Sequence, residues 1–145
     1  IVGQQYGQVF EQVKLDQSRV TQLGYVSDEA LAALYQRARC LVFPSLYEGF
    51  GLPPVEAMLS GCPVIVSNTS SLPEVCGDAA LYCDPHRPQT LADGISRLVC
   101  EPALATQMKE RGLARASQFT WERAADQMLQ RLVQAVKEDS DKETA

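Results

Sequence analysis

Histidine and positive charge are both scarce in this sequence. Acidic residues outnumber basic residues by 18 to 13, which gives a net charge of −5. Because nucleic-acid binding needs a basic surface, this balance argues against nucleic-acid partners. The single histidine, His86, lies in a proline-rich turn, and the sequence offers no partners for a metal site around it. A phosphorylated small molecule stays open as a ligand, since a helix N-terminus can bind phosphate without net positive charge.

Long hydrophobic runs are also missing. The longest apolar stretches, such as Cys40–Pro44 and Pro63–Val66, are too short to cross a bilayer. The five cysteines are odd in number and contain no C-x-x-C pair, so we interpret them as reduced cytosolic thiols. The chain has no signal peptide and no initiator methionine, and we therefore expect a fragment, a processed product or an excised domain.

Short apolar runs separated by long segments predict the fold class. Cys40–Pro44, Pro63–Ser67 and Ala80–Asp84 are typical of strands buried on both faces. Arg19–Val26 is interpreted as a further strand that ends near Gly24, and Ile1-Val2 as the tail of another. The segments between strands are too long for hairpins, which favours a parallel sheet with crossover helices on its faces. The prediction is an α/β fold, a Rossmann-like parallel sheet flanked by helices.

Helical spacing of apolar residues and capping residues predict the helices. Ser27 or Asp28 can cap one of them, and Thr120 another. Trp121 is expected to pin the last helix to the domain. The apolar stripe on that helix is expected to be core or a domain contact: Met128, Leu129, Leu132, Val133 and Val136. The predicted helices span residues 5–16, 27–38, 54–61, 87–101, 103–119 and 120–138. The domain is therefore predicted over 1–138, with 139–145 as a flexible charged tail.

The stretch YEGFGLPPVEAMLSGCPV carries the chemistry. It follows a predicted strand, and ligands of open α/β sheets bind at the carboxyl ends of the strands. A helix starting near Pro54 would point the amides of Gly51 and Leu52 at an anion such as a phosphate. Glu48 and Glu56 flank these amides, and carboxylates accept hydrogen bonds from hydroxyls. A nucleotide sugar offers hydroxyls on both sides of a diphosphate. Taken singly, each glutamate could equally be a cap or loop residue, and the glycines a turn.

The longer stretch PSLYEGFGLPPVEAMLSGCPVIVSNTSSLPEV resembles the signature of the retaining glycosyltransferases of the GT-B type, family four, also called group 1. That signature is a Glu, seven residues and a second Glu, matched here by Glu48 and Glu56. The similarity extends from LGYVSDEALAALYQRA through LPEVCGDAALYCDP to FTWERAA. The resemblance implies the C-terminal half of a GT-B fold, the donor-binding domain of a two-domain enzyme.

The resemblance also implies roles for individual residues. Glu48 would be the catalytic carboxylate that contacts the donor sugar, and Glu56 would hold the ribose hydroxyls. The remaining donor-binding positions are Phe50, Gly51 and Leu52 for sugar and diphosphate, Gly3 facing the phosphates, and Gly24, Tyr25 and Val26 beside the base. Residues 68–71 follow a strand end next to this cleft and could touch ligand, although a capped turn explains them as well.

The implied reaction is transfer of a hexose from a GDP- or UDP-sugar with retention of configuration and without a metal or other cofactor. An upstream Arg and Lys clamp and the acceptor domain are expected outside this chain, so the chain alone is expected to be inactive. A cytoplasmic location is implied, with peripheral contact to the inner membrane through the acceptor domain as an open alternative. A non-catalytic nucleotide-sugar binding module is the competing function. A Rossmann-type dehydrogenase ranks low because G-x-G-x-x-G is missing after a strand.

Overall fold

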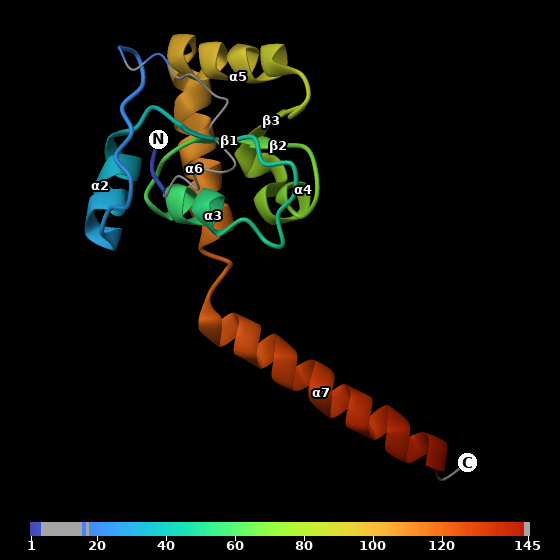
Figure 1. The fold of residues 1–145 in the computed structure, drawn as a ribbon. Helices are drawn as coiled ribbons and strands as arrows, with labels where there is room; N and C mark the ends of the chain where they lie inside the picture. Colours follow the sequence, from blue (N-terminus) through green and yellow to red (C-terminus); the bar gives the residue numbers. More distant parts are fainter. Residues whose placement is uncertain (4–15, 17, 144–145) are drawn as a thin grey trace.

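The computed structural model describes residues 1–3, 16 and 18–143 and is drawn in Figure 1. Three strands alternate with helices, and only helices follow the last strand. In chain order the elements are α2 (Asp28–Arg37), β1 (Leu41–Phe43), α3 (Leu52–Leu59), β2 (Val64–Ser67), α4 (Leu72–Cys76), the 3-10 helix η1 (Gly77–Ala79), β3 (Ala80–Cys83), α5 (Pro88–Cys100), α6 (Pro102–Ala116) and α7 (Trp121–Glu143). The predicted α/β class is confirmed.

The three strands form one parallel sheet in the order β1-β2-β3. Leu41 pairs with Val64, and Val64 pairs in turn with Ala80. Parallel strands end at the same edge of a sheet, so the loops that follow β1 and β2 leave the sheet side by side. This edge carries the EGFGLPP segment, as the sequence predicts.

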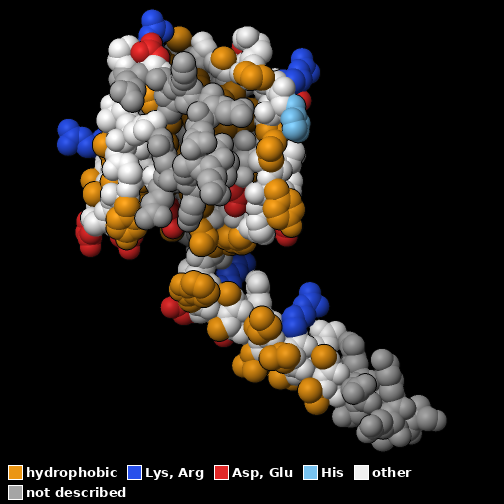
Figure 2. All heavy atoms as spheres, viewed as in Figure 1, with side chains coloured by type: hydrophobic (Ala, Val, Ile, Leu, Met, Phe, Trp, Pro, Cys, Tyr) orange, Lys and Arg blue, Asp and Glu red, His pale blue; other side chains and the backbone are white. Residues whose placement is uncertain are grey.

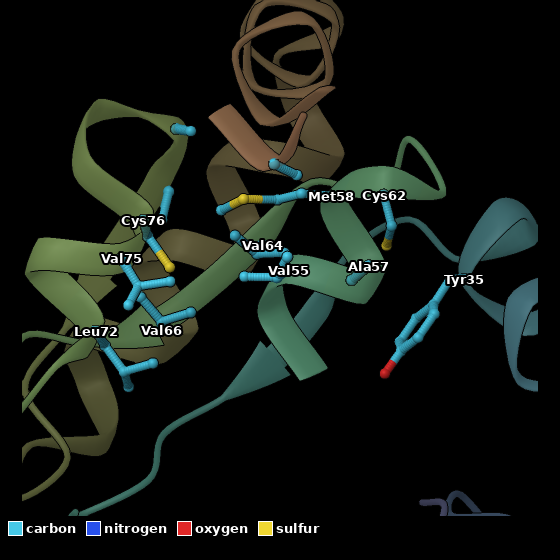
Figure 3. Close-up of a cluster of buried hydrophobic side chains, with 13 residues drawn as sticks. Tyr35, Val55, Ala57, Met58, Cys62, Val64, Val66, Leu72, Val75 and Cys76 are labelled. Carbon is cyan, nitrogen blue, oxygen red and sulfur yellow. The ribbon is translucent and has the colours of Figure 1, made fainter. Parts of the chain in front are cut away.

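Strand β2 is buried on both faces, which explains its continuous apolar sequence. Val64 and Val66 lie in a core cluster with residues of α3 and α4, drawn in Figure 3. Ile65 points to the opposite face, into a second cluster that includes Leu98 of α5 and Met108 of α6. The sheet therefore lies between α5 on one face and α3 and α4 on the other, as Figure 1 shows.

Arg115 of α6 contacts both α4 and the segment that follows α6. Its Nε donates to the carbonyl of Val75 at 2.8 Å, and its Nη2 donates to the carbonyl of Glu74 at 2.6 Å. The guanidinium carbon also lies 5.2 Å from the ring centroid of Phe119, a cation–π arrangement. These contacts satisfy carbonyls near the end of α4 that the short helix cannot pair within itself.

Two expectations for the first part of the chain have different outcomes. The predicted strand Arg19–Val26 is wrong: this segment makes one isolated parallel bridge, between Val2 and Gly24. Gly24, where the strand was predicted to end, has a φ of +63° and is the residue of this segment that forms the bridge. The predicted helix over 5–16 falls on residues that lie outside the described part of the chain, apart from Asp16. The short helix α4 was not predicted.

Helix α7 departs from the prediction for the last helix. Trp121 is 88% exposed, so the expectation that it pins α7 to the domain is wrong. No residue in the described part of the chain buries its ring. The stripe Met128, Leu129, Leu132, Val133 and Val136 is exposed too and is not core, and Figure 2 shows hydrophobic side chains along this helix. Whether the stripe contacts another domain stays a prediction. α7 continues to Glu143, into the segment expected to be a charged tail.

None of the described helices combines the length and hydropathy needed to cross a membrane.

Candidate functional site

The loop after β1 ends in a tight turn at Gly51, which is the N-cap of α3 with a φ of +98°. A Cβ at this position would lie 2.6 Å from Cδ2 of the buried Leu72, so both the backbone angle and the space require glycine. α3 begins at Leu52, two residues before the expected Pro54. Pro53 and Pro54 have no N–H, so the free amides of this helix end belong to Gly51 and Leu52.

Glu48 is held by serine hydroxyls from two segments. The Ser45 hydroxyl donates to Glu48 Oε1 at 2.7 Å. The Ser70 hydroxyl donates to the Glu48 carbonyl at 2.6 Å and accepts from the Glu48 N–H at 3.2 Å. The Ser71 hydroxyl lies 3.0 Å from the carbonyls of both Glu48 and Phe50. The loop after β2 therefore fixes the path of the loop after β1.

The same two loops are also joined by hydrogen bonds nearer to the ends of β1 and β2. The hydroxyls of Ser67 and Thr69 both donate to the carbonyl of Ser45, and Thr69 also reaches the carbonyl of Leu46 at 3.3 Å. Ser67 is fully buried at the end of β2. Its hydroxyl thus satisfies a carbonyl of the neighbouring loop, as buried polar groups require.

Glu56 lies on α3 and is exposed. It lines one end of a mainly apolar cavity of about 600 Å³ between α2, β1, α3 and the first residues of the chain. Tyr35 of α2 lines the same cavity. Burial raises the pKa of the Tyr35 hydroxyl, and the Glu56 carboxylate raises it further.

The N-terminal candidates form a separate group. The N–H of Gly3 donates to the carbonyl of Gly24 at 2.9 Å. The adjacent residues Val2 and Leu23 line the same cavity as Glu56. Tyr25 and Val26 are outside the described lining of that cavity, and Tyr25 is 81% exposed. The structure therefore brings Gly3 and Gly24 together, but it joins neither Tyr25 nor Val26 to the glutamates through a described contact.

Glu48, Phe50, Gly51, Leu52 and Glu56 form one continuous loop and helix, as predicted, and their roles stay predictions. Sequence reasoning did not select Ser45, and it left residues 68–71 open between ligand contact and a capped turn. The hydroxyls of Thr69, Ser70 and Ser71 bind backbone carbonyls of the loop after β1, but no described side chain caps α4, and a ligand contact of residues 68–71 stays a prediction. The available signal was the presence of several hydroxyl residues near the ends of the first two strands, namely Ser45, Ser67, Thr69, Ser70 and Ser71.

Phe50 also has a side-chain contact that the sequence did not suggest. Its ring meets Phe119 edge to face, with the centroids 5.5 Å apart. This contact links the loop to the segment between α6 and α7. Among the described residues, no group of three or more His, Cys, Asp or Glu side chains could hold a metal ion.

A family model described as glycosyl transferases group 1 matches residues 1–115. The chain belongs to this family. The O-antigen chain mannosyltransferase B of Escherichia coli is 48% identical over 107 residues, which cover 74% of this chain and 28% of that protein. A GDP-mannose-dependent alpha-(1-6)-phosphatidylinositol dimannoside mannosyltransferase of Mycobacterium tuberculosis is 36% identical over 107 residues, 73% of this chain and 28% of that protein.

A solved structure supports the fold of this group 1 glycosyltransferase domain. The sucrose-phosphate synthase of Thermosynechococcus elongatus matches with a TM-score of 0.73 and 34% identity over 90% of this chain and 33% of that chain. The expected GT-B type of fold is thereby confirmed. The chain spans little more than a quarter of the length of the two mannosyltransferases named above.

Proposed function

We propose that this chain is the donor-binding domain of a hexosyltransferase that takes its sugar from a nucleoside-diphosphate sugar. One observation carries the proposal: Glu48 and Glu56 flank the free amides of Gly51 and Leu52 at the carboxyl edge of the sheet. The amides and the positive end of α3 suit a diphosphate. The carboxylates suit the hydroxyl groups on its two sides.

Mannose is the favoured hexose, and GDP the favoured nucleotide. The support comes from the relatives, since the protein at 48% identity is a mannosyltransferase and the Mycobacterium tuberculosis relative is GDP-mannose-dependent. A UDP-sugar is the second candidate donor, because the family includes enzymes of different donor specificity.

Each candidate residue is assigned to a different part of the donor. Glu56 accepts hydrogen bonds from the ribose hydroxyls next to the cavity that it lines. Gly51 and Leu52 bind the diphosphate through their amides. Glu48 accepts hydrogen bonds from hydroxyls of the transferred sugar, next to the reacting carbon. Gly3 and Gly24 approach the donor from the other side of the cavity, with Tyr25 and Val26 near the base. This last placement rests on the family resemblance alone.

The proposed reaction retains the configuration of the sugar. The bond between the anomeric carbon and the diphosphate oxygen breaks, and the acceptor oxygen forms its bond on the same face. The acceptor proton passes to the departing diphosphate. A glycosidase-like pair of acid and nucleophile is disfavoured, because Glu56 is assigned to ribose and a single carboxylate then remains at the sugar. Positive groups that stabilise the diphosphate, and the acceptor domain, would come from outside this chain.

The chain on its own is therefore expected to transfer no sugar. A cytoplasmic location, with contact to the inner membrane through the acceptor domain, belongs to the same proposal. A non-catalytic nucleotide-sugar binding module would use the same donor contacts and would show no transfer even in the complete protein.

The test is steady-state kinetics of the complete protein with GDP-mannose and UDP-sugars. Glu48→Gln should lower kcat by about 100-fold or more with little change in donor affinity, because it acts on the reacting sugar. Glu56→Ala should instead raise the donor KM at least tenfold, since it removes ground-state contacts. Glu110→Gln on the exposed side of α6 is the matched control. If both site variants changed donor binding alone, the division of roles would be wrong, and absence of transfer would favour the binding module.

A further inference from the structure

Ser70 has a backbone conformation that side-chain-bearing residues rarely adopt. Its φ is +58°, and among the described residues it is the one non-glycine residue with a positive φ. Glycine would take this angle without steric cost, and asparagine or aspartate would tolerate it better than serine. A strained residue next to a binding loop points to a requirement for its side chain.

The strained backbone places the Ser70 hydroxyl against the main chain of Glu48. The hydroxyl donates to the Glu48 carbonyl at 2.6 Å and accepts from the Glu48 N–H at 3.2 Å, so it engages both backbone groups of one residue. A glycine at this position would have no group to do so. The hydroxyl therefore explains why the position carries serine despite its backbone angle.

A second hydroxyl holds the other end of Glu48. Ser45 donates to Oε1 of the carboxylate at 2.7 Å, a charge-assisted hydrogen bond. Ser45 lies two residues after the end of β1, and its own carbonyl accepts hydrogen bonds from Ser67 and Thr69. The donor to the carboxylate is thus anchored to two strands of the sheet rather than carried on a loose loop.

We propose that Ser45 and Ser70 are positioning residues for Glu48, which aim its carboxylate at the donor sugar. The inference rests on the role of Glu48 in the proposed function. Ser70 fixes the backbone of Glu48, and Ser45 fixes Oε1, so that Oε2 is directed to the sugar. Small displacements of a reacting group carry large costs in rate, so loss of either hydroxyl lowers the rate of the chemical step more than donor binding.

The experiment measures kcat and donor KM for the complete enzyme carrying Ser45→Ala, Ser45→Thr, Ser70→Ala or Ser70→Gly. We expect Ser45→Ala to lower kcat about tenfold with KM within twofold, and Ser45→Thr to restore kcat to within about threefold. Ser70→Gly relieves the strain but lacks the hydroxyl, so it should lose kcat as Ser70→Ala does. Ser96→Ala, an exposed serine on α5, is the matched control.

Two results would overturn the proposal. If Ser70→Gly kept full kcat, the position would matter only for its backbone angle. If the alanine variants lowered kcat and thermal stability together, and Ser45→Thr failed to rescue, the hydroxyls would serve only the fold. Thermal unfolding of each variant separates these cases.

A double-mutant cycle separates this proposal from the proposed function. In a Glu48→Gln background, Ser45→Ala should cause less than a twofold further loss, because it acts through the carboxylate. If Glu48→Gln itself left kcat unchanged, the role assigned to Glu48 in the proposed function would be wrong. If Glu48→Gln lowered kcat and Ser45→Ala added its full effect independently, the proposed function would stand and the positioning role would be wrong.

Discussion

Replacement of Gly51 by alanine should be among the most damaging small changes in this domain. The residue has a φ of +98°, where an L side chain costs about 1–3 kcal/mol. The new Cβ would lie 2.6 Å from Cδ2 of Leu72, well inside contact distance. Leu72 is fully buried, so relief of this overlap requires the core to shift, at a cost of about 1–3 kcal/mol.

Alanine also restricts the unfolded chain, which returns about 0.4–1 kcal/mol of stability. The net expectation is a loss of about 1–5.5 kcal/mol in the free energy of unfolding. For a domain of this size that loss lowers Tm by about 3–16 °C. Urea unfolding followed by circular dichroism, with thermal unfolding beside it, measures both quantities without any ligand.

Gly49→Ala is the matched control in the same loop. A Cβ at Gly49 would meet nothing within 4 Å, and its φ lies outside the range that L side chains avoid. Its stability should stay within about 0.5 kcal/mol of the wild type. The reasoning is refuted if Gly51→Ala costs less than about 1 kcal/mol, or if the two glycines respond alike.

Two further predictions concern the support of the site. Arg115→Lys should destabilise the domain by about 1.5–3 kcal/mol in urea unfolding. Lysine cannot reproduce both the hydrogen bonds to two carbonyls of α4 and the stacking on the Phe119 ring. An unchanged unfolding midpoint would contradict this prediction. Burial raises the pKa of the Cys62 and Cys76 thiols to about 11, above the unfolded value near 9. The stability that this shift contributes is complete below pH 9 and is lost as the pH rises through 11. The unfolding free energy should therefore fall across that window, less so in Cys→Ser variants, and an equal fall in those variants would exclude these thiols as the cause.

The central strand β2 could be predicted from the sequence because it is buried on both faces, whereas β1 is half-buried and β3 exposes Tyr82. Val64, Ile65 and Val66 form a continuous apolar run whose side chains enter two different clusters. Arg19–Val26 has no such continuous apolar run, and within the described part of the chain its pairing is limited to the bridge between Gly24 and Val2. Local pattern identifies apolar segments, whereas strand pairing is decided by the neighbours.

The candidate site was predictable only in part, for a related reason. Glu48 and Glu56 stand in one short motif with Gly51 between them, so their grouping follows from the local sequence. The contacts of Ser45 and Ser70 with Glu48 depend on how two loops from different strands leave the sheet. Neither the hydrogen bonds nor the φ of Ser70 can be read from residue types. Trp121 was misplaced because its size predicts burial, and no described residue covers it.

Calorimetric titration of the complete protein with GDP, UDP and ADP tests the central claim most directly, with Glu56→Ala as the variant and Glu110→Gln as its control. The account predicts that one nucleoside diphosphate, with GDP favoured, binds the wild type and the control equally. Glu56→Ala should weaken that binding at least tenfold. Equal affinity of the Glu56→Ala variant, or binding of none of the three nucleotides, would contradict the assignment of this domain to the donor.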